Sequence, residues 1–279
     1  MVKISADSTC DLSPELQKRY NVTIQPLYIV RDGDSLRDGV EIRSEDIFAY
    51  VEKTGKLLKT AAVSVEDYLN LFRRLTQDGS EVVHVTISSE MSACYQNACL
   101  AAREVPGVYP VDSRNLSTGM GLVVIEAARR AQAGEGGAQI QKAMDELTAR
   151  VEASFVIERL DYLYKGGRCS ALAALGANLL HMKPCIEVRN GKMGVGKKYR
   201  GAYEKVLRQY AYDRLHGRSD IARDRAFITW STCPEPALDA VRAVCREEGG
   251  FDELLETQAG CTICNHCGPN TLGVLFIRK

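Results

Sequence analysis

The chain has 279 residues, 45% hydrophobic and 26% charged, so it can bury a substantial core and is neither disordered nor fibrous. Lys plus Arg and Asp plus Glu number 36 each, which excludes the broad basic surface that holds nucleic acids or anionic membranes. There is no apolar run of the roughly 20 residues that a spanning helix needs, and the first residues are unlike a signal peptide. We therefore expect a cytoplasmic protein whose partners are small molecules or proteins.

The first half of the chain predicts strands and helices in alternation. We expect strands at 2–5, 22–30, 81–87 and 108–111, helices that begin near 13, 44 and 64, and helices at 91–103 and 117–133. Two of these helix starts carry clear capping signals, Ser13 followed by Pro14 and Ser64 followed by Asp67. Such alternation predicts a parallel sheet covered on both faces, with functional loops at the carboxyl ends of its strands.

The pattern changes after about residue 154, where we expect a second domain to begin. Asn190-Gly191 predicts a hairpin, and further strands and helices are expected at 155–163, 184–188, 192–199, 202–215, 226–231, 235–248 and 274–278. The predicted fold class is α/β with two domains. Residues 1–155 would carry the parallel sheet and residues 156–279 a mixed or antiparallel one, with a ligand in the cleft between them. The segment near 60–77 could pack with the second domain.

Three loops rich in Ser and Thr follow predicted strands. They are residues 7–9, 60–64 and 88–92. Hydroxyl groups and free backbone N–H groups at helix starts can hold a carboxylate or phosphate without a lysine. Any one of these Ser or Thr residues would be interpreted as a helix cap, but three such loops together favour an anion site.

Two glycine-containing loops add cationic or titratable groups, at 165–168 and 265–270. Arg168 would either bind an anion or join the two halves of the protein through a carboxylate, and we expect the second. His266 is either a hydrogen-bonded loop residue or a ligand contact, with neither favoured. His84, inside its strand, is expected simply to be packed.

Four soft ligands, Cys261, Cys264, His266 and Cys267, lie within seven residues, which would suit zinc or an iron–sulfur cluster. Because no second ligand pair exists elsewhere, we expect no metal and a thiol-rich strand and turn instead. The common nucleotide, hydrolase and metalloprotease signatures (GxxxxGK[ST], GxGxxG, GxSxG and HExxH) are absent. No cofactor is expected.

Taken in order, these segments resemble the DegV family, whose members include the fatty-acid-binding B subunits of bacterial fatty acid kinase. The resemblance covers nearly the whole chain. It rests on KISADSTCDLSPEL at the start, RDG at 37–39, SSEMSACYQNA at 88–98, VDSRNLSTGMG at 111–121, LDYLYKGGR at 160–168, KP at 183–184, KYRG at 198–201 and HCGPNTLGV near the end. It implies a two-domain α/β protein that holds one long-chain fatty acid between its domains, with the acyl chain buried.

The resemblance also implies site residues. Thr60 and Ser92 would hold the fatty-acid carboxyl, with His266 near it, and Arg200 and Arg168 would contact a kinase partner or its phosphoryl group. The supporting loop positions are Ser64, Ser88, Ser89, Ala93 and Gly268. In this scheme a separate ATP-dependent kinase converts the bound carboxyl to an acyl phosphate, so the chain itself would be a lipid-binding protein and not an enzyme.

The chain departs from the family pattern at several of these loops. Residues 61–63 lack the usual polar and proline residues, Ala93 replaces a glycine, Cys267 a threonine and Asn270 a glycine. Two further functions stay open: an acyl or phosphate ester hydrolase with Ser92 as nucleophile and His266 as base, and a metal- or redox-responsive protein that uses the cluster at 261–267. Lipid transport without a kinase is also open.

Overall fold

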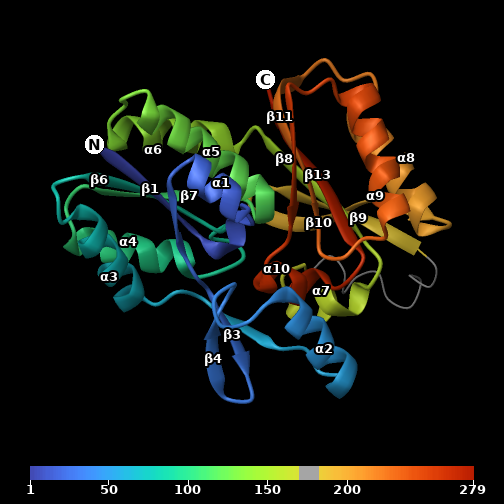
Figure 1. The fold of residues 1–279 in the computed structure, drawn as a ribbon, viewed down its shortest axis with the longest axis horizontal. Helices are drawn as coiled ribbons and strands as arrows, with labels where there is room; N and C mark the ends of the chain where they lie inside the picture. Colours follow the sequence, from blue (N-terminus) through green and yellow to red (C-terminus); the bar gives the residue numbers. More distant parts are fainter. Residues whose placement is uncertain (170–181) are drawn as a thin grey trace.

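The computed structural model describes residues 1–169 and 182–279, and its first unit is a parallel sheet in the order β2-β1-β6-β7. The strands are β1 (Val2–Asp7), β2 (Val22–Gln25), β6 (Glu81–Thr86) and β7 (Val108–Asp112). The helices are α1 (Pro14–Arg19), α3 (Val65–Thr76), α4 (Cys94–Glu104), α5 (Ser117–Gln132) and α6 (Gly137–Thr148). Helices α3 and α4 lie on one side of this sheet and α5 and α6 on the other (Figure 1). The predicted parallel sheet with two covered faces is confirmed.

The second unit is a mixed sheet in the order β10-β9-β8-β13-β11-β12, in which only the β11–β12 pair is parallel. Its strands are β8 (Val151–Ile157), β9 (Met182–Arg189), β10 (Lys192–Arg200), β11 (Ile221–Trp230), β12 (Glu253–Gln258) and β13 (Thr271–Arg278). Helices α8 (Tyr203–Leu215) and α9 (Glu235–Val244) cover one face, followed by a π-helical turn at Cys245–Gly249. Strand β8 pairs with β13 along its whole length, so it runs through the domain boundary expected at 155.

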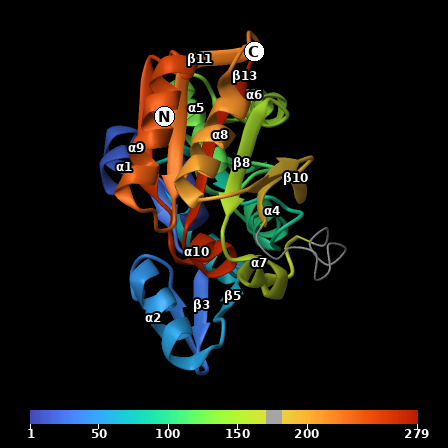
Figure 2. The ribbon, with the colours of Figure 1, turned by 90° about the vertical axis from the view of Figure 1, so that its right-hand side faces the viewer.

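A small antiparallel sheet in the order β4-β3-β5 lies below both units. It contains β3 (Tyr28–Arg31), β4 (Asp34–Arg37) and β5 (Lys59–Ala61), with α2 (Ser44–Thr54) beside it. The single strand expected at 22–30 is wrong: Pro26 carries no N–H for a ladder, and the chain passes there from the first sheet into the small one. Figure 2 shows the small sheet and α2 beneath the short helix α10 (Cys261–Cys267).

Helix α5 joins the two large units because it packs against strands of both sheets. Two of its glycines make this approach close. A Cβ atom at Gly121 would lie 2.8 Å from the carbonyl oxygen of Cys10, in the first unit, and one at Gly119 would lie 3.1 Å from the Cβ of Ala153, in the second. The hydroxyls of Thr118 and Thr229 add a 2.6 Å hydrogen bond across the same contact. The two units are therefore closely packed around α5.

The two parts of the segment near 60–77 pack against different parts of the protein. Thr60 belongs to β5 of the small sheet, whereas α3 packs on α4 and β6 of the first unit. In the part of the chain that the structure describes, no helix has both the length and the apolar character of a bilayer span.

Candidate functional site

A cavity of about 230 Å³ lies where the small sheet, the loop before α4 and helix α10 meet. Five of the residues predicted from the sequence line it together: Thr60, Ser92, Ala93, Arg168 and His266. The remaining lining residues are Leu27, Ala61, Ala62, Ile87, Met91, Leu116, Met193, Thr262, Ile263 and Cys267. The cavity thus has a small polar group of side chains in a largely apolar wall.

Thr60 and His266 form the centre of the polar group. The Oγ1 atom of Thr60 lies 2.9 Å from Nε2 of His266. Its other ring nitrogen, Nδ1, is buried and has no hydrogen-bond partner among the described residues. Gly166, in helix α7 (Leu160–Gly166), packs directly against this nitrogen, since a Cβ atom there would lie 2.4 Å from Nδ1. Only a glycine at 166 allows the imidazole to occupy its place.

Burial and the nearby charge of Arg168 lower the pKa of His266 to about 4. The imidazole is therefore neutral at pH 7, so it brings no positive charge to the cavity, and its Nε2 is engaged with the Thr60 hydroxyl. Arg168 is the cation that lines this cavity, and its Nη1 donates a 2.8 Å hydrogen bond to the carbonyl oxygen of Gly166. A carboxylate here would be held by neutral donors beside one guanidinium.

The sequence interpretation that Arg168 joins the two halves through a carboxylate finds no support. Within the described ranges, no acidic side chain forms an ion pair with it, and its Nε points instead to the carbonyl oxygen of Met91, 3.5 Å away. The guanidinium thus reaches across to the first unit through a backbone carbonyl.

Ser92 lies directly before α4. Its Oγ accepts a 3.3 Å hydrogen bond from the backbone N–H of Cys94 and lies 3.2 Å from the thiol of the same residue. A thiol is a weak acceptor, so the hydroxyl proton can turn toward an anion in the cavity at little cost. The start of α4 adds the partial positive charge of a helix N-terminus at the same wall.

The predicted supporting residues lie in different places. Ser64 is exposed and caps α3 in a reciprocal capping box with Asp67, outside the cavity wall. Ser88 is buried and donates a 2.8 Å hydrogen bond to the carbonyl of Gly191 in the β9–β10 turn, so it fixes the loop that leads to Ser92. The exposed Ser89 and the buried Gly268 are also outside the wall.

The strand and turn expected at 261–267 is wrong, because the segment forms helix α10. Its N-terminal N–H groups are satisfied by a side chain 223 residues away: Asp38 accepts hydrogen bonds from the backbone of Cys261 (3.0 Å) and Thr262 (3.2 Å) and from the Thr262 hydroxyl (2.7 Å). This remote cap allows a short helix without a local capping residue. It also fixes the orientation of His266 on the last turn.

A second buried carboxyl group supports the same helix start. Asp11 accepts hydrogen bonds from the backbone of Gly260 (2.9 Å) and the hydroxyl of Ser117 (2.6 Å). Burial raises the pKa of Asp11 to about 7, with a smaller contribution from the charge of Asp38 and opposition from the two hydrogen bonds. Asp11 and Asp38 stand in the DSTCD and RDG segments, but nothing in those segments predicts these roles, because the backbone groups they accept from lie more than 200 residues away.

The cysteines of α10 point to separate neighbours. The thiol of Cys261 lies 3.1 Å from the carbonyl of Ile42, and that of Cys264 lies 3.3 Å from the carbonyl of Ala259. Burial raises the pKa of the Cys267 thiol to about 12, so it is protonated at pH 7. Among residues 1–169 and 182–279, no three His, Cys, Asp or Glu side chains converge to hold a metal. The geometry of these side chains therefore does not support a metal- or redox-responsive function for the cluster at 261–267.

The hydrolase alternative is also without support. A serine nucleophile needs the imidazole to face its hydroxyl and an acid to orient the other ring nitrogen. Here Nε2 of His266 bonds to Thr60 and not to Ser92, and Nδ1 faces Gly166. The described residues do not form such a triad.

A second, apolar cavity of about 30 Å³ lies next to the first, and Leu116, Ile263 and Cys267 line both. Its other lining residues are Ser117, Ala153, Phe155, Thr229, Trp230, Ser231, Ala259, Thr271, Gly273 and Leu275. An apolar space between α5 and the second sheet thus adjoins the polar group.

Two further candidates lie away from the cavity. Arg200 is exposed on β10, with Nη2 3.8 Å from the sulfur of Met182. His84 is fully buried, as expected, and bonds to Ser5 (2.9 Å) and Asp7 (3.3 Å). Asp7 also accepts the backbone N–H of Ile87 (3.1 Å), so this network fixes one apolar residue of the cavity wall.

Comparisons with known proteins agree along the whole chain. The family model described as "Uncharacterised protein, DegV family" matches residues 1–279. A DegV domain-containing protein from Caldanaerobacter subterraneus subsp. tengcongensis is 31% identical, covering 100% of this chain and 99% of the relative. A solved structure reporting fatty acid binding of a DegV family protein from Thermus thermophilus has a TM-score of 0.89 at 29% identity, covering 100% and 99% of the two chains. A stearic acid-binding protein from Eubacterium ventriosum has a TM-score of 0.85 at 27% identity, with the same coverage.

Proposed function

Because the chain belongs to the DegV family, we propose that it binds one long-chain fatty acid, with the carboxyl group at Thr60, Ser92 and His266. The observation that carries the proposal is the meeting of these three side chains in one cavity, with a second, apolar cavity on the other side of Leu116. Solved relatives at 26–29% identity are described as binding fatty acids, one of them stearic acid.

A fatty acid has an apolar acyl chain and a polar carboxyl group, and the site offers an apolar wall and a polar group of side chains. Burying about 15 methylenes at about 0.8 kcal/mol each gives ample gross affinity. A carboxylate opposes burial unless it is hydrogen-bonded. The Thr60 and Ser92 hydroxyls supply the donors, and the imidazole of His266 orients the Thr60 hydroxyl beside the carboxyl group. Arg168 supplies the compensating charge.

The bound carboxyl group would then be presented to a separate ATP-dependent kinase, which would form the acyl phosphate. Two observations support this step. The sequence lacks the GxxxxGK[ST] loop that binds the phosphates of ATP in many kinases, which fits a phosphoryl donor held by another protein. Arg200 is exposed and Arg168 lies at the cavity wall, where guanidinium groups could contact the partner or its phosphoryl group. Carriage of the fatty acid without a kinase would use the same cavity.

Calorimetric titration of lipid-free protein tests the binding proposal. Stearic acid should bind tightly, octanoic acid much more weakly because it buries fewer methylenes, and stearyl alcohol more weakly than stearic acid because it lacks the carboxylate that Arg168 compensates. Equal affinity for the acid and the alcohol would refute the placement of the carboxyl group. Addition of ATP and a fatty acid kinase subunit, with detection of acyl phosphate as its hydroxamate, tests the second step.

A further inference from the structure

A third cavity, of about 580 Å³, lies between the two large units and is separate from the proposed fatty-acid site. None of Thr60, Ser92, Arg168 or His266 lines it. Its walls come from the loop after β7, the end of α6, strands β8 and β9 with their turn, α8 and the end of β13. The lining residues are Arg114, Asn115, Thr148, Ala149, Val151, Glu152, Ala153, Glu187, Val188, Arg189, Asn190, Gly191, Arg214 and Arg278. Its volume falls in the range of small-molecule sites, roughly 300–1,000 Å³.

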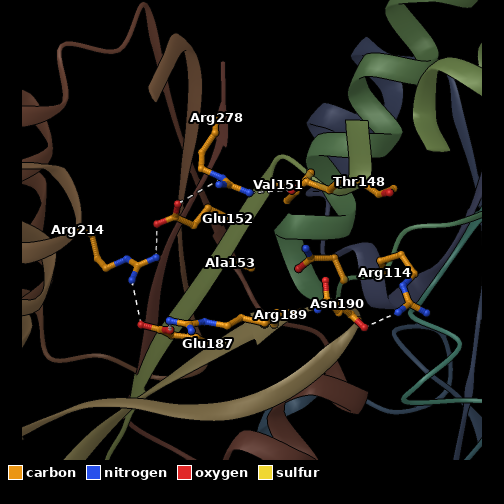
Figure 3. A pocket seen from close by; sticks show the side chains of 14 residues that line it. Arg114, Thr148, Val151, Glu152, Ala153, Glu187, Arg189, Asn190, Arg214 and Arg278 are labelled. Atoms are coloured by element: carbon orange, nitrogen blue, oxygen red, sulfur yellow. Dashed lines mark hydrogen bonds and ion pairs between the residues drawn. The ribbon is translucent and has the colours of Figure 1, made fainter. Parts of the chain in front are cut away.

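The charged residues of this cavity are four arginines against two glutamates, a net charge of +2. Figure 3 shows Arg278, Glu152, Arg214 and Glu187 joined as one wall, with Arg114 and Asn190 facing it. Both glutamates are already paired: Glu152 with Arg214, Arg278 and Arg218, which lies outside the lining, and Glu187 with Arg214 (3.1 Å) and Arg189 (2.5 Å). Arg189, Arg214 and Arg278 therefore share two carboxylates, and the positive charge of the wall exceeds the negative.

Two of the arginine side chains in this wall are partly exposed to solvent, so a ligand could reach them. The side chain of Arg189 is 81% exposed and that of Arg278 is 45% exposed. Arg214 is mostly buried, and its Nε has no hydrogen-bond partner among the described residues. Charge on Arg114 is compensated from outside the cavity by Glu90 (3.5 Å) and Asp112 (3.6 Å). The uncompensated charge of the cavity therefore lies on the side of Arg189, Arg214 and Arg278.

We propose that this cavity binds a small organic phosphate monoester, with the phosphate between Arg189 and Arg278 and the organic part against Val151, Ala153 and Val188. A phosphate monoester carries about −1.5 to −2 charges at pH 7, and the three arginines on this side of the cavity exceed its two glutamates by one positive charge, which compensates part of the phosphate charge. Its three oxygens can accept N–H groups from more than one guanidinium, as arginine forks favour. The volume left beside the phosphate leaves room for an organic part. The monoester comes from a soluble metabolite or from a lipid headgroup.

Calorimetric titration with phenyl phosphate tests the proposal, with phenol as the uncharged comparison and vesicles of 20% phosphatidic acid in phosphatidylcholine as the lipid source. The double variant Arg189→Gln/Arg278→Gln should bind phenyl phosphate at least about tenfold more weakly, since each lost contact is a hydrogen bond to a charged group. The control Arg74→Gln/Arg103→Gln removes two exposed arginines outside the cavity wall and has the same net charge. It should bind within about twofold of the parent protein.

The two probes distinguish a soluble phosphate ester from a lipid headgroup, and the variants distinguish this cavity from the rest of the surface. Saturable binding of phenyl phosphate but not of vesicles indicates a soluble ester, and the reverse indicates a lipid headgroup, provided that the Arg189/Arg278 variant loses it. Arg168→Gln should leave the binding unchanged, which separates this cavity from the proposed fatty-acid site. No saturable binding of either probe, or equal losses in the cavity variant and the charge-matched control, would overturn the proposal.

Discussion

The hydroxyl of Thr60 lies 2.9 Å from Nε2 of His266, although 206 residues separate the two. One comes from the small sheet and the other from the last turn of α10. The contact therefore depends on how α10 is held against the small sheet.

Removing the hydroxyl donors should weaken fatty-acid binding. Thr60→Val and Ser92→Ala each remove one donor to the carboxylate, which is worth about 1.5–3 kcal/mol. Isothermal titration with stearic acid should show a loss of this size for each variant, while the melting temperature changes little.

Ser64 offers a contrasting hydroxyl in the same part of the chain. Because it caps α3 and lies outside the cavity wall, Ser64→Ala should cost about 1 kcal/mol of stability and leave the affinity for stearic acid unchanged. A fall in the affinity for stearic acid without a change in the free energy of unfolding would contradict this prediction. It would indicate that Ser64 contacts the fatty acid, as the sequence suggested.

Gly166 should be needed for the position of His266. A Cβ atom at 166 would lie 2.4 Å from Nδ1, so Gly166→Ala must displace the imidazole and weaken fatty-acid binding. Gly194→Ala is the matched control, because no atom lies within 4 Å of its Cβ position. Titration of both variants should show a loss only for Gly166→Ala, and equal affinities would contradict the packing described here.

His266 should remain neutral throughout the physiological pH range. Its pKa is lowered to about 4 by burial and by Arg168, so its ring signals in a proton–carbon NMR titration should not move between pH 5.5 and 8 in the lipid-free protein. His266→Asn identifies the signals. A midpoint near 6.5 would show that the imidazole is solvated and that it could bind the carboxylate as a cation.

Asp11 should make the protein less stable as the pH rises from about 4 to about 7. The folded state keeps the Asp11 proton up to about pH 7, whereas the unfolded chain loses it near 3.8, so the folded state binds more protons in this interval. The slope is at most about 1.4 kcal/mol per pH unit. His266 acts in the opposite direction between about pH 4 and 6.5, because there the unfolded state binds the extra proton.

The comparison with Asp11→Asn isolates the contribution of Asp11, since both proteins keep His266. In urea unfolding, the stability of the parent protein relative to the variant should fall between pH 4 and 7 and stay level above pH 7. A difference that is constant over this range would mean that Asp11 is ionised in the folded state.

Local sequence signals predicted most of the first unit, including the strand-loop-helix order that places Ser92 before α4. The family resemblance implied Thr60, Ser92 and His266 as carboxyl-binding residues, but the contact between Thr60 and His266 appears only in the structure. What could not be predicted depends on remote contacts. Helix α10 begins where the side chain of Asp38, which is distant in the sequence, accepts hydrogen bonds from its first backbone N–H groups. The sequence near residue 261 contains no signal that predicts this cap. The role of Gly166 likewise appears only when α7 packs against His266.

The large cavity at Arg114 and Arg278 was missed for the same reason. Its arginines come from four separate segments, each of which by itself looks like an ordinary charged surface. Only the pairing of β8 with β13 and with β9 brings Glu152, Arg278 and Glu187 together.

The most direct test of the central claim is mass spectrometry of the purified protein under native conditions, followed by denaturation and organic extraction. The account predicts one added mass per chain that is released as a single carboxylic acid of roughly 14–20 carbons, a size consistent with the burial estimate. The Thr60→Val/Ser92→Ala double variant should carry much less of it. A protein that stays empty after incubation with stearic acid, or that retains the same lipid in the double variant, would contradict the account.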